Sequence, residues 1–511
     1  MAIVREFHKP DFFITMTCNP KWKEIQAELS DGQTPQDHPD LTARVFKLKE
    51  DQLMKDLISG QLLGQVVAHM NVIEFQKRGL PHCHILLILA DHDRLIAKEF
   101  VDQVIVAELP PSPKDATDQD QKEARQRLQD IVTTSMIHGS CGSSNPSSPC
   151  IENGKCSKGF PKSFLKETIV DSENSYATYR RRSPEDGGRT FKHPKTGKQI
   201  DNQWVVPYNP YLSMRYDCHI NVECCASPKA TKYLFKYVTK GSDRAIVTTE
   251  VCANCEQPRD EISEFQDLRS IGSSEAAWKL LSFPIADRYP AVIALRVHLK
   301  DQQQIIFDEE TEIEALETPR ETELTAFFKF NSESSQDPQS QPKYVDMPKS
   351  HVYNKKNKEW TVRKKADAVI GRVHSINPVA GEVYYLRMLL HDNHCRGKTS
   401  YEDMLILPSG RQCETFKEVC FELGLLNDDR EWYRIMEESA ATKMCPQLRE
   451  LFVIVLMFCL PSDPCALFLE FWETWTDDFV RHAEQRGFQL SEGQMKTMVL
   501  LDIELWLSSY E

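Results

Sequence analysis

The sequence predicts an α+β protein in which an antiparallel sheet with helices on one side precedes a small mixed segment and a helical C-terminal region. Two observations support this fold class. A strand-like run, a helical stretch and a hairpin pattern follow one another within residues 12–89, and helical periodicity continues throughout from residue 416 onward. With 511 residues, the chain is long enough for about two to four domains, each with its own core.

The N-terminal elements are predicted in chain order. Residues 12–17 (FFITMT) read as a strand that ends in a Cys-Asn-Pro turn. Apolar residues at helical spacing predict a helix over about 41–63, and the alternation over 65–75 predicts a second strand. A turn at 77–81 leads into the returning strand at 83–89.

Further along, the charged, proline-containing residues from about 110 to 126 predict an exposed connection. Residues 214–225 are strand-like. A helix is then predicted to begin at Ser227, with serine as the N-cap and Pro228 at the first helical position, and to end at Gly241.

These patterns divide the chain into three regions. We expect residues 1–250 to form the first domain, with a cysteine-rich, basic insertion at about 108–205. Residues 251–415 are a mixed α/β accessory region whose segment 308–350, rich in Glu, Ser, Gln and Pro, reads as an acidic linker. Residues 416–511 are a helical, acidic C-terminal region.

Charge and cysteine content indicate the compartment and the partner. The net charge of −14 argues mildly against nucleic acid, but residues 153–200 contain 11 basic against 5 acidic residues, whereas residues 421–511 contain 7 against 17. A basic middle fits a DNA-contacting module, although solvated faces would give the same counts. The 16 cysteines in so long a chain favour reduced thiols and metal clusters over a secreted disulfide scaffold. We therefore expect an intracellular, nuclear protein.

We expect no membrane association. The apolar run Leu451–Leu460 is too short for a membrane span and reads as a core helix. The N-terminus also lacks the pattern of a secretory signal.

Two histidines are the leading metal-ligand candidates. His82 and His84 are two residues apart on a predicted strand, so both imidazoles share one face and Cys83 faces the other way. Glu74 and Gln76 on the preceding strand share a face and could meet them across the hairpin. This set suits Mg²⁺ or Mn²⁺. Either residue could be the third ligand, and Glu74 is preferred because a carboxylate holds a hard cation better.

Two tyrosines are candidate nucleophiles. Tyr233 and Tyr237 share one face of the predicted helix, and Lys232, Lys236 and Lys240 form a second stripe at the same spacing. A phenol with a pKa near ~10 needs a cation or a base nearby to act as a nucleophile at neutral pH. We expect Lys240 to assist the tyrosines, although most helical tyrosines are core or interface residues.

A second ligand set lies in the basic insertion. His138, Cys141, Cys150 and Cys156 have the type and number of ligands for one tetrahedral Zn²⁺, with a spacing unlike that of a standard zinc finger. The alternative is a set of unrelated thiols. Basic residues are the candidates for holding the DNA backbone without reading its sequence: Arg180, Arg181, Arg182, Lys232 and Lys236.

Three stretches, in this order, resemble the three motifs of HUH endonucleases: FFITMTCNP, EFQKRGLPHCHILL and KYLFKYVTKG. The amino-acid sequences of these stretches are most similar to the replication-initiator domain of Helitron transposases. The resemblance implies a ferredoxin-like (RRM-like) nuclease core, a divalent metal and rolling-circle cleavage of single-stranded DNA through a 5′-phosphotyrosine intermediate. By the same resemblance, His82 and His84 are metal ligands, and Tyr233 and Tyr237 are the nucleophiles.

One departure from Helitron proteins concerns the helicase. Residues 392–399 (DNHCRGKT) come nearest to a phosphate-binding loop but have Asp where the first Gly is needed. We therefore expect a helicase partner encoded downstream or separately. Two rival hypotheses stay open: a catalytically silent remnant that binds DNA or protein, and a metal-dependent hydrolase in which water attacks the phosphate.

Overall fold

The chain forms two compact units, residues 7–289 and residues 1–6 with 290–511. The computed structural model describes residues 2–75, 80–93, 98–139, 141, 145, 147–152, 154–170, 176–192, 197–225, 271–303, 321–334, 337–364, 368–374, 376, 378–426, 430–440, 443–459, 461 and 463–508. None of the helices within these ranges is long and apolar enough to span a bilayer. The two units are described separately below.

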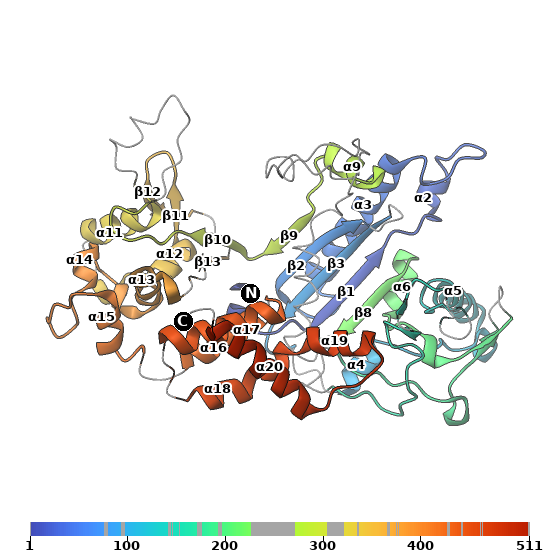
Figure 1. Cartoon of the computed structure of the whole chain (residues 1–511). Helices are drawn as coiled ribbons and strands as arrows, with labels where there is room; N and C mark the ends of the chain where they lie inside the picture. Colours follow the sequence, from blue (N-terminus) through green and yellow to red (C-terminus); the bar gives the residue numbers. More distant parts are fainter. Residues whose placement is uncertain are drawn as a thin grey trace, which may run out of the picture. The chain divides into compact units, whose positions relative to one another are not determined.

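The first unit is built on a five-stranded sheet in the order β8-β1-β3-β2-β9, and all neighbouring strands are antiparallel (Figure 1). The predicted α+β class with an antiparallel sheet is therefore confirmed. The strands are β1 (Phe12–Thr17), β2 (Val66–Phe75), β3 (Pro81–Leu89), β8 (Ile220–Cys224) and β9 (Ala286–Tyr289).

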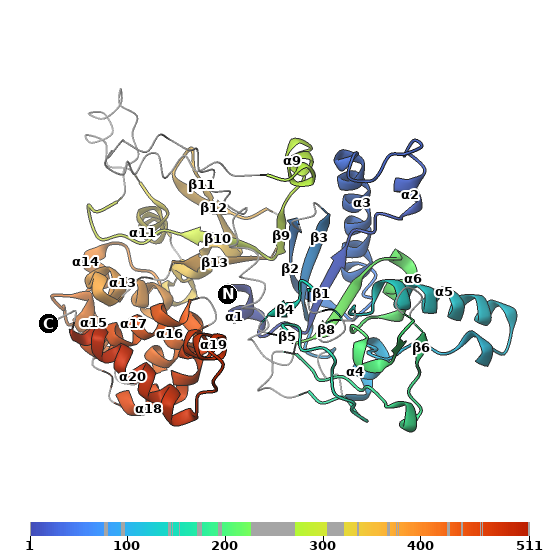
Figure 2. The same cartoon turned by 45° about the vertical axis from the view of Figure 1, so that its right-hand side comes forward.

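One face of this sheet packs against α3 (Pro39–Ile58) and α9 (Ser273–Leu280), which lie against each other (Figures 1 and 2). Alternation along the strands makes this possible, because every second side chain points toward the helices. The side chains that fill this core come from both layers: Ile14, Met16, Cys83, Ile85 and Leu87 from the strands, and Phe46, Leu53, Leu57 and Trp278 from the helices.

Between β3 and β8 the chain forms a long segment, of which residues 158–163 and 176–179 lie across a cavity from the other face of the sheet. Its helices are α4 (Lys98–Val104), α5 (Gln119–Ser135) and α6 (Pro210–Tyr216), and its short hairpins are β4 (Ile151–Glu152) with β5 (Lys155–Cys156) and β6 (Phe191–Lys192) with β7 (Gln199–Ile200). The short helix α2 (Lys23–Gln26) follows β1. The cysteine-rich insertion predicted at about 108–205 belongs to this segment.

The second unit begins with α1 (Ala2–Phe7) and contains two small sheets. One is the parallel pair β10 (Ala291–Leu295) and β13 (Val369–Val373), and the other is the antiparallel pair β11 (His351–Asn354) and β12 (Glu359–Val362). The helices that accompany these sheets are α11 (Glu323–Glu333), α12 (Met347–Ser350), α13 (Glu382–His391) and α14 (Tyr401–Met404). This arrangement matches the mixed α/β character predicted for the middle of the chain.

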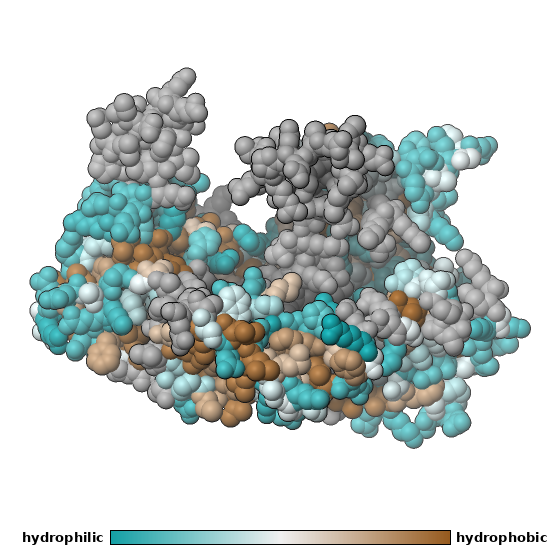
Figure 3. Space-filling model, in the orientation of Figure 1, coloured by the Kyte–Doolittle hydropathy of each residue, from teal (hydrophilic) through white to brown (hydrophobic). Residues whose placement is uncertain are grey.

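The end of the second unit is helical, as predicted. Its helices are α15 (Phe416–Glu422), α16 (Arg430–Ala440), α17 (Cys445–Ile454), α18 (Pro464–Phe471), α19 (Asp477–Gln485) and α20 (Glu492–Ser508). The apolar run that begins at Leu451 contributes to the core of this bundle, since residues 451–455 are buried, whereas Met457 is exposed. Hydrophobic side chains also reach the surface over these helices, among them the exposed Leu500, Leu501 and Leu505 of α20 (Figure 3).

Three predicted elements differ from the structure. The expected exposed connection over 110–126 is exposed but becomes α5 after Asp118, whose side chain accepts a hydrogen bond from the backbone N–H of Gln121 as an N-cap. Within the expected linker 308–350, residues 323–333 form α11, because Leu324, Phe327 and Phe328 share a buried face. The strand predicted over 214–225 is instead the end of α6 followed by β8. The helix predicted from Ser227 lies outside the described residues.

Candidate functional site

The face of the sheet opposite α3 carries a patch of polar side chains that strand pairing brings together. On β3, His82 lies between Thr17 of β1 and Glu74 of β2, directly opposite each of them. Two residues along, His84 lies opposite Thr15, which is itself opposite Asn221 of β8. The two histidines therefore share one face, and Cys83 is fully buried on the helix side.

Hydroxyl groups from β1 orient both imidazole rings. Thr17 Oγ1 lies 2.9 Å from His82 Nδ1, and Thr15 Oγ1 lies 3.0 Å from His84 Nδ1. Hydrogen bonds of this kind hold the ring and the tautomer of a metal-binding histidine, and they leave Nε2 for the ligand. Both rings are thus fixed at Nδ1, so that their Nε2 atoms point away from β1.

The two Nε2 atoms have different surroundings. His84 Nε2 lies 3.2 Å from a carboxylate oxygen of Glu74. His82 Nε2 is buried and has no hydrogen-bond partner among the described residues. A buried polar atom without a partner is costly, and a bound cation would satisfy it. Two imidazole nitrogens with one carboxylate therefore form a donor set that fits a divalent ion.

Electrostatics favour the ligand form of His82. The pKa of His82 is lowered to about 4, mainly by burial and to a smaller extent by repulsion from His84 and His219, while Glu74 opposes the shift. At neutral pH the ring is consequently uncharged and keeps a lone pair. Metal binding would then not have to compete with a proton on this nitrogen.

A third histidine, His219, lies beside this patch and was not predicted to belong to it. Its backbone carbonyl accepts a hydrogen bond from the Thr17 N–H at 2.9 Å. His219 therefore lies on the opposite side of Thr17 from His82, which is the partner of Thr17 on β3. Its Nδ1 lies 2.7 Å from the Ser135 carbonyl, which can only accept, so Nδ1 carries the proton. Burial also lowers the pKa of His219, which leaves Nε2 as a lone pair in the neutral ring.

These histidines line a cavity of about 1130 Å³ between the sheet and the insertion. The sheet contributes Thr15, Thr17, Glu74, His82, His84, Asn221 and Glu223. The insertion contributes Lys158, Phe160, Lys162, Tyr179 and Arg181, together with His138 and Cys150. The cavity is therefore polar on both sides and contains acidic, basic and aromatic groups.

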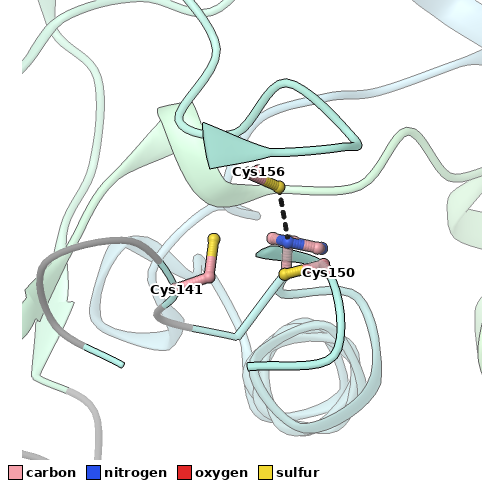
Figure 4. Close-up of side chains that lie close together, drawn as sticks. Cys141, Cys150 and Cys156 are labelled. Atoms are coloured by element: carbon pink, nitrogen blue, oxygen red, sulfur yellow. Dashed lines mark hydrogen bonds between the residues drawn. The ribbon is translucent and has the colours of Figure 1, made fainter. Parts of the chain in front are cut away.

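The predicted cysteine cluster assembles at the insertion side of this cavity. The ligand atoms of His138, Cys141, Cys150 and Cys156 all lie within 4.8 Å of one another. Figure 4 shows the sulfurs of the three cysteines around one small space, with the 3.4 Å contact between Cys156 Sγ and His138 Nε2. A tetrahedral zinc with bonds of about 2.3 Å to sulfur would separate its ligands by about 3.8 Å, so only a small contraction is needed.

The cluster also has the hydrogen bonds that thiolate ligands receive. Burial raises the pKa of the Cys156 thiol, but N–H groups of Phe160 and Lys158 donate to its sulfur, and the net result is a pKa below its ordinary value. Burial and the neighbouring cysteines raise the pKa of Cys141 to about 12. Four soft or borderline ligands in one place can bind a metal and are compatible with Zn²⁺.

The three consecutive arginines make structural contacts. Arg181 is buried, and its Nη1 donates to the carbonyls of Ala107, Asn202 and Val205. Arg182 forms a bidentate pair with Glu108, and Arg180 lies 3.3 Å from Asp102. All three therefore have protein partners, and the prediction that they hold DNA stays a prediction.

Several predicted site residues fall outside the described residues. These are Tyr233, Tyr237, Lys232, Lys236 and Lys240 on the predicted tyrosine helix, and Gln76, which was predicted to lie on the same strand as Glu74. Of the two candidates for the third metal ligand, only Glu74 can therefore be placed, and it lies beside His84.

Comparison with known families finds a match to the N-terminal part of the chain. Residues 1–87 match the family model described as a Helitron helicase-like domain at the N-terminus. This range contains β1, β2 and nearly all of β3, including both histidines. The resemblance to Helitron proteins read from the motifs is confirmed over these residues. The comparison with curated proteins found no match.

Proposed function

We propose that this chain, with its Helitron-like N-terminal domain, is a metal-dependent endonuclease and strand transferase that acts on single-stranded DNA in rolling-circle transposition. The observation that carries the proposal is the cluster of His82, His84 and Glu74 on the open face of the sheet, inside the region that matches the family model. Single-stranded DNA as partner, a helicase that works with the chain, and nuclear location are parts of the same proposal.

The cluster defines the metal site of this proposal. His82, His84 and Glu74 would hold Mg²⁺ or Mn²⁺, and the ion would supply positive charge next to the scissile phosphate when bound. The residues of the chain itself have positioning tasks. Thr15 and Thr17 keep the two rings in place, and the neutral state of His82 keeps its lone pair available at neutral pH.

The tyrosines would perform the transfer. The phenol oxygen of Tyr233 or Tyr237 forms a bond to the scissile phosphorus, and the bond from phosphorus to the 3′ oxygen breaks. The phenol proton passes to solvent, and the departing 3′ oxygen takes up a proton as a hydroxyl group. The 5′ end then remains attached to tyrosine, so the energy of the phosphodiester is kept for rejoining. A second tyrosine allows another transfer before the first is reversed, and Lys240 would assist the charge on the phenol.

A direct test is to incubate the purified chain with an end-labelled single-stranded oligonucleotide and Mn²⁺ and to detect a protein–DNA adduct on a denaturing gel. We expect an adduct with the wild type and with Tyr211→Phe, a control at an exposed tyrosine away from the motif. The double variant Tyr233→Phe/Tyr237→Phe should form none. The proposal fails if varied substrates give no adduct with the wild type, or if the double variant forms as much.

The same experiment separates the rival hypotheses. DNA that is bound but never attached to protein would favour a silent binding protein. Hydrolysed DNA without a covalent adduct would favour attack by water. A metal-dependent adduct that needs the tyrosines is expected from the transferase alone.

A further inference from the structure

The cavity has a second wall that the proposed reaction does not use. Opposite the histidines, the loop over residues 156–162 (CSKGFPK) contributes Lys158, Phe160 and Lys162 to the lining. Lys162 Nζ donates to the Lys158 carbonyl at 2.9 Å and lies 5.1 Å from the centre of the Phe160 ring. The Lys162 ammonium and the Phe160 ring therefore lie together in the cavity lining, and Lys158 belongs to the same part of the loop.

This loop is built directly on the cysteine cluster. Its first residue, Cys156, is one of the four ligands, and the sulfur accepts hydrogen bonds from the N–H groups of Lys158 and Phe160. The Gly159 N–H donates to the Cys156 carbonyl at 2.8 Å, and Gly159 has a φ of +64°, which favours glycine. A turn that wraps a ligand sulfur in this way takes its shape from the position of that sulfur.

A second ligand fixes the aromatic side chain. The rings of Phe160 and His138 are stacked, with centres 4.3 Å apart and planes 12° apart. The position of Phe160 thus depends on two of the four cluster ligands, Cys156 through the backbone and His138 through the ring. The end of the loop is held separately, because the Lys162 N–H donates to the Gln203 carbonyl at 3.0 Å and Gln203 Nε2 donates to the Lys162 carbonyl at 2.8 Å. The contacts that position Lys158 and Phe160 therefore depend on the cluster ligands, which a metal would hold together.

The chemistry of this wall suits the backbone of single-stranded nucleic acid. Lysines contact phosphates without reading sequence, and exposed rings stack on bases. The cavity of about 1130 Å³ is larger than most pockets for small ligands, which favours a segment of polymer. Glu223 also lines the cavity and would repel phosphate, but it accepts a hydrogen bond from Asn221 on the sheet side.

We propose that Lys158 and Lys162 form a binding site for the phosphates of single-stranded DNA, and that metal in the cysteine cluster is required to shape it. The nature of the ligand rests on the proposed function, whereas the dependence on metal rests on the contacts of the loop. The cluster metal would accordingly support DNA binding and take no part in strand cleavage.

The test measures fluorescence anisotropy of a labelled single-stranded oligonucleotide in the absence of Mg²⁺ and Mn²⁺, at several salt concentrations. We expect Lys158→Ala/Lys162→Ala to weaken binding at least ~10-fold and to lower the salt slope by about 1.4, roughly 0.7 for each phosphate of a single strand that a lysine no longer neutralises. Its zinc content, measured by mass spectrometry, should stay at that of the wild type. Lys155→Ala is the matched control, because Lys155 directly precedes the loop and carries the same charge but does not line the cavity.

The metal dependence is tested with Cys156→Ser. We expect this variant to lose its zinc and to bind DNA as weakly as the double lysine variant, while circular dichroism shows that the remaining fold is kept. The inference is overturned if the double lysine variant binds like Lys155→Ala, or if Cys156→Ser lacks zinc and still binds like the wild type. This binding test is independent of the adduct assay described above. If DNA binding follows the expected pattern but the adduct assay gives no adduct, the proposed function is refuted and this inference stands.

Discussion

The two candidate metal centres of the first unit line the same cavity but are built in opposite ways. The histidine patch takes its ligands from neighbouring strands, and hydrogen bonds to Thr15 and Thr17 fix its rings. The cysteine cluster takes its ligands from loops and from the end of the short strand β5, and the Cys156 sulfur accepts hydrogen bonds from the turn that follows it. The first is a nitrogen and oxygen site on a rigid frame, and the second is a sulfur-rich site that shapes its own surroundings. The comparison suggests that metal is needed for chemistry at one centre and for local structure at the other.

The largest effect is expected from removing the structural centre. Cys156→Ser should lose zinc and leave the insertion open to proteolysis, because structural zinc sites contribute apparent binding free energies of roughly 10–16 kcal/mol. Limited proteolysis with metal analysis checks this, and the exposed Cys465→Ser serves as the control. Retention of one zinc per chain by Cys156→Ser would contradict the assignment.

A smaller effect concerns acid sensitivity at the histidine patch. The pKa of His82 is about 4 in the fold against an ordinary value of 6.5, so above pH 6.5 neither the folded nor the unfolded chain carries this proton. As the pH falls toward 4, the unfolded chain takes up a proton that the folded chain does not. The contribution of neutral His82 to the free energy of unfolding is therefore lost over this window, by about 3 kcal/mol.

Denaturant unfolding of the metal-free chain at pH 7.5 and pH 4.5 checks this prediction. His82→Gln cannot take up the proton, so its stability relative to the wild type should improve at the lower pH by the amount just given. The reading of His82 as a buried neutral ring would be wrong if the difference between the two proteins were the same at both pH values.

The smallest effect is expected when the hydroxyl groups of Thr15 and Thr17 are removed, and it concerns the affinity for metal. Thr15→Val and Thr17→Val keep the shape of the side chain but remove the hydrogen bond to Nδ1, and such changes typically weaken metal binding ~10–100-fold. Titration with Mn²⁺ followed by electron paramagnetic resonance measures the affinity. Thr361→Val, at an exposed position in the other unit, is the control and should bind Mn²⁺ like the wild type. Unchanged affinity in both β1 variants would remove the threonines from the site.

Local patterns predicted much of this picture. The bounds of β1 were predicted as observed, because FFITMT alternates and ends at a Cys-Asn-Pro turn. The shared face of His82 and His84 follows from their spacing alone once the strand is recognised. The four ligands of the cysteine cluster were also named from sequence, because one histidine and three cysteines within 19 residues have the type and number of ligands for one tetrahedral metal.

The remaining features depend on contacts between distant residues. Thr15, Thr17 and His219 belong to the patch only through the register of β1 with β3 and β8, which no local pattern encodes. The helix α11 was hidden by its acidic, serine-rich surroundings, and burial of Phe327 and Phe328 in the core of the second unit stabilises it. The arginine triplet reads as a DNA contact in sequence, but Arg181 turns inward to three backbone carbonyls.

The central claim is that the histidine patch, and not the cysteine cluster, holds the metal used for strand cleavage. The most direct measurement compares the Mn²⁺-dependent adduct and the zinc content of His82→Ala/His84→Ala in one preparation, with the exposed His92→Ala as control. We predict that the double variant forms at least ~100-fold less adduct, as expected when a transition-state interaction is removed, while its zinc content equals that of the wild type. An adduct formed at the wild-type rate without these two imidazoles would contradict the account.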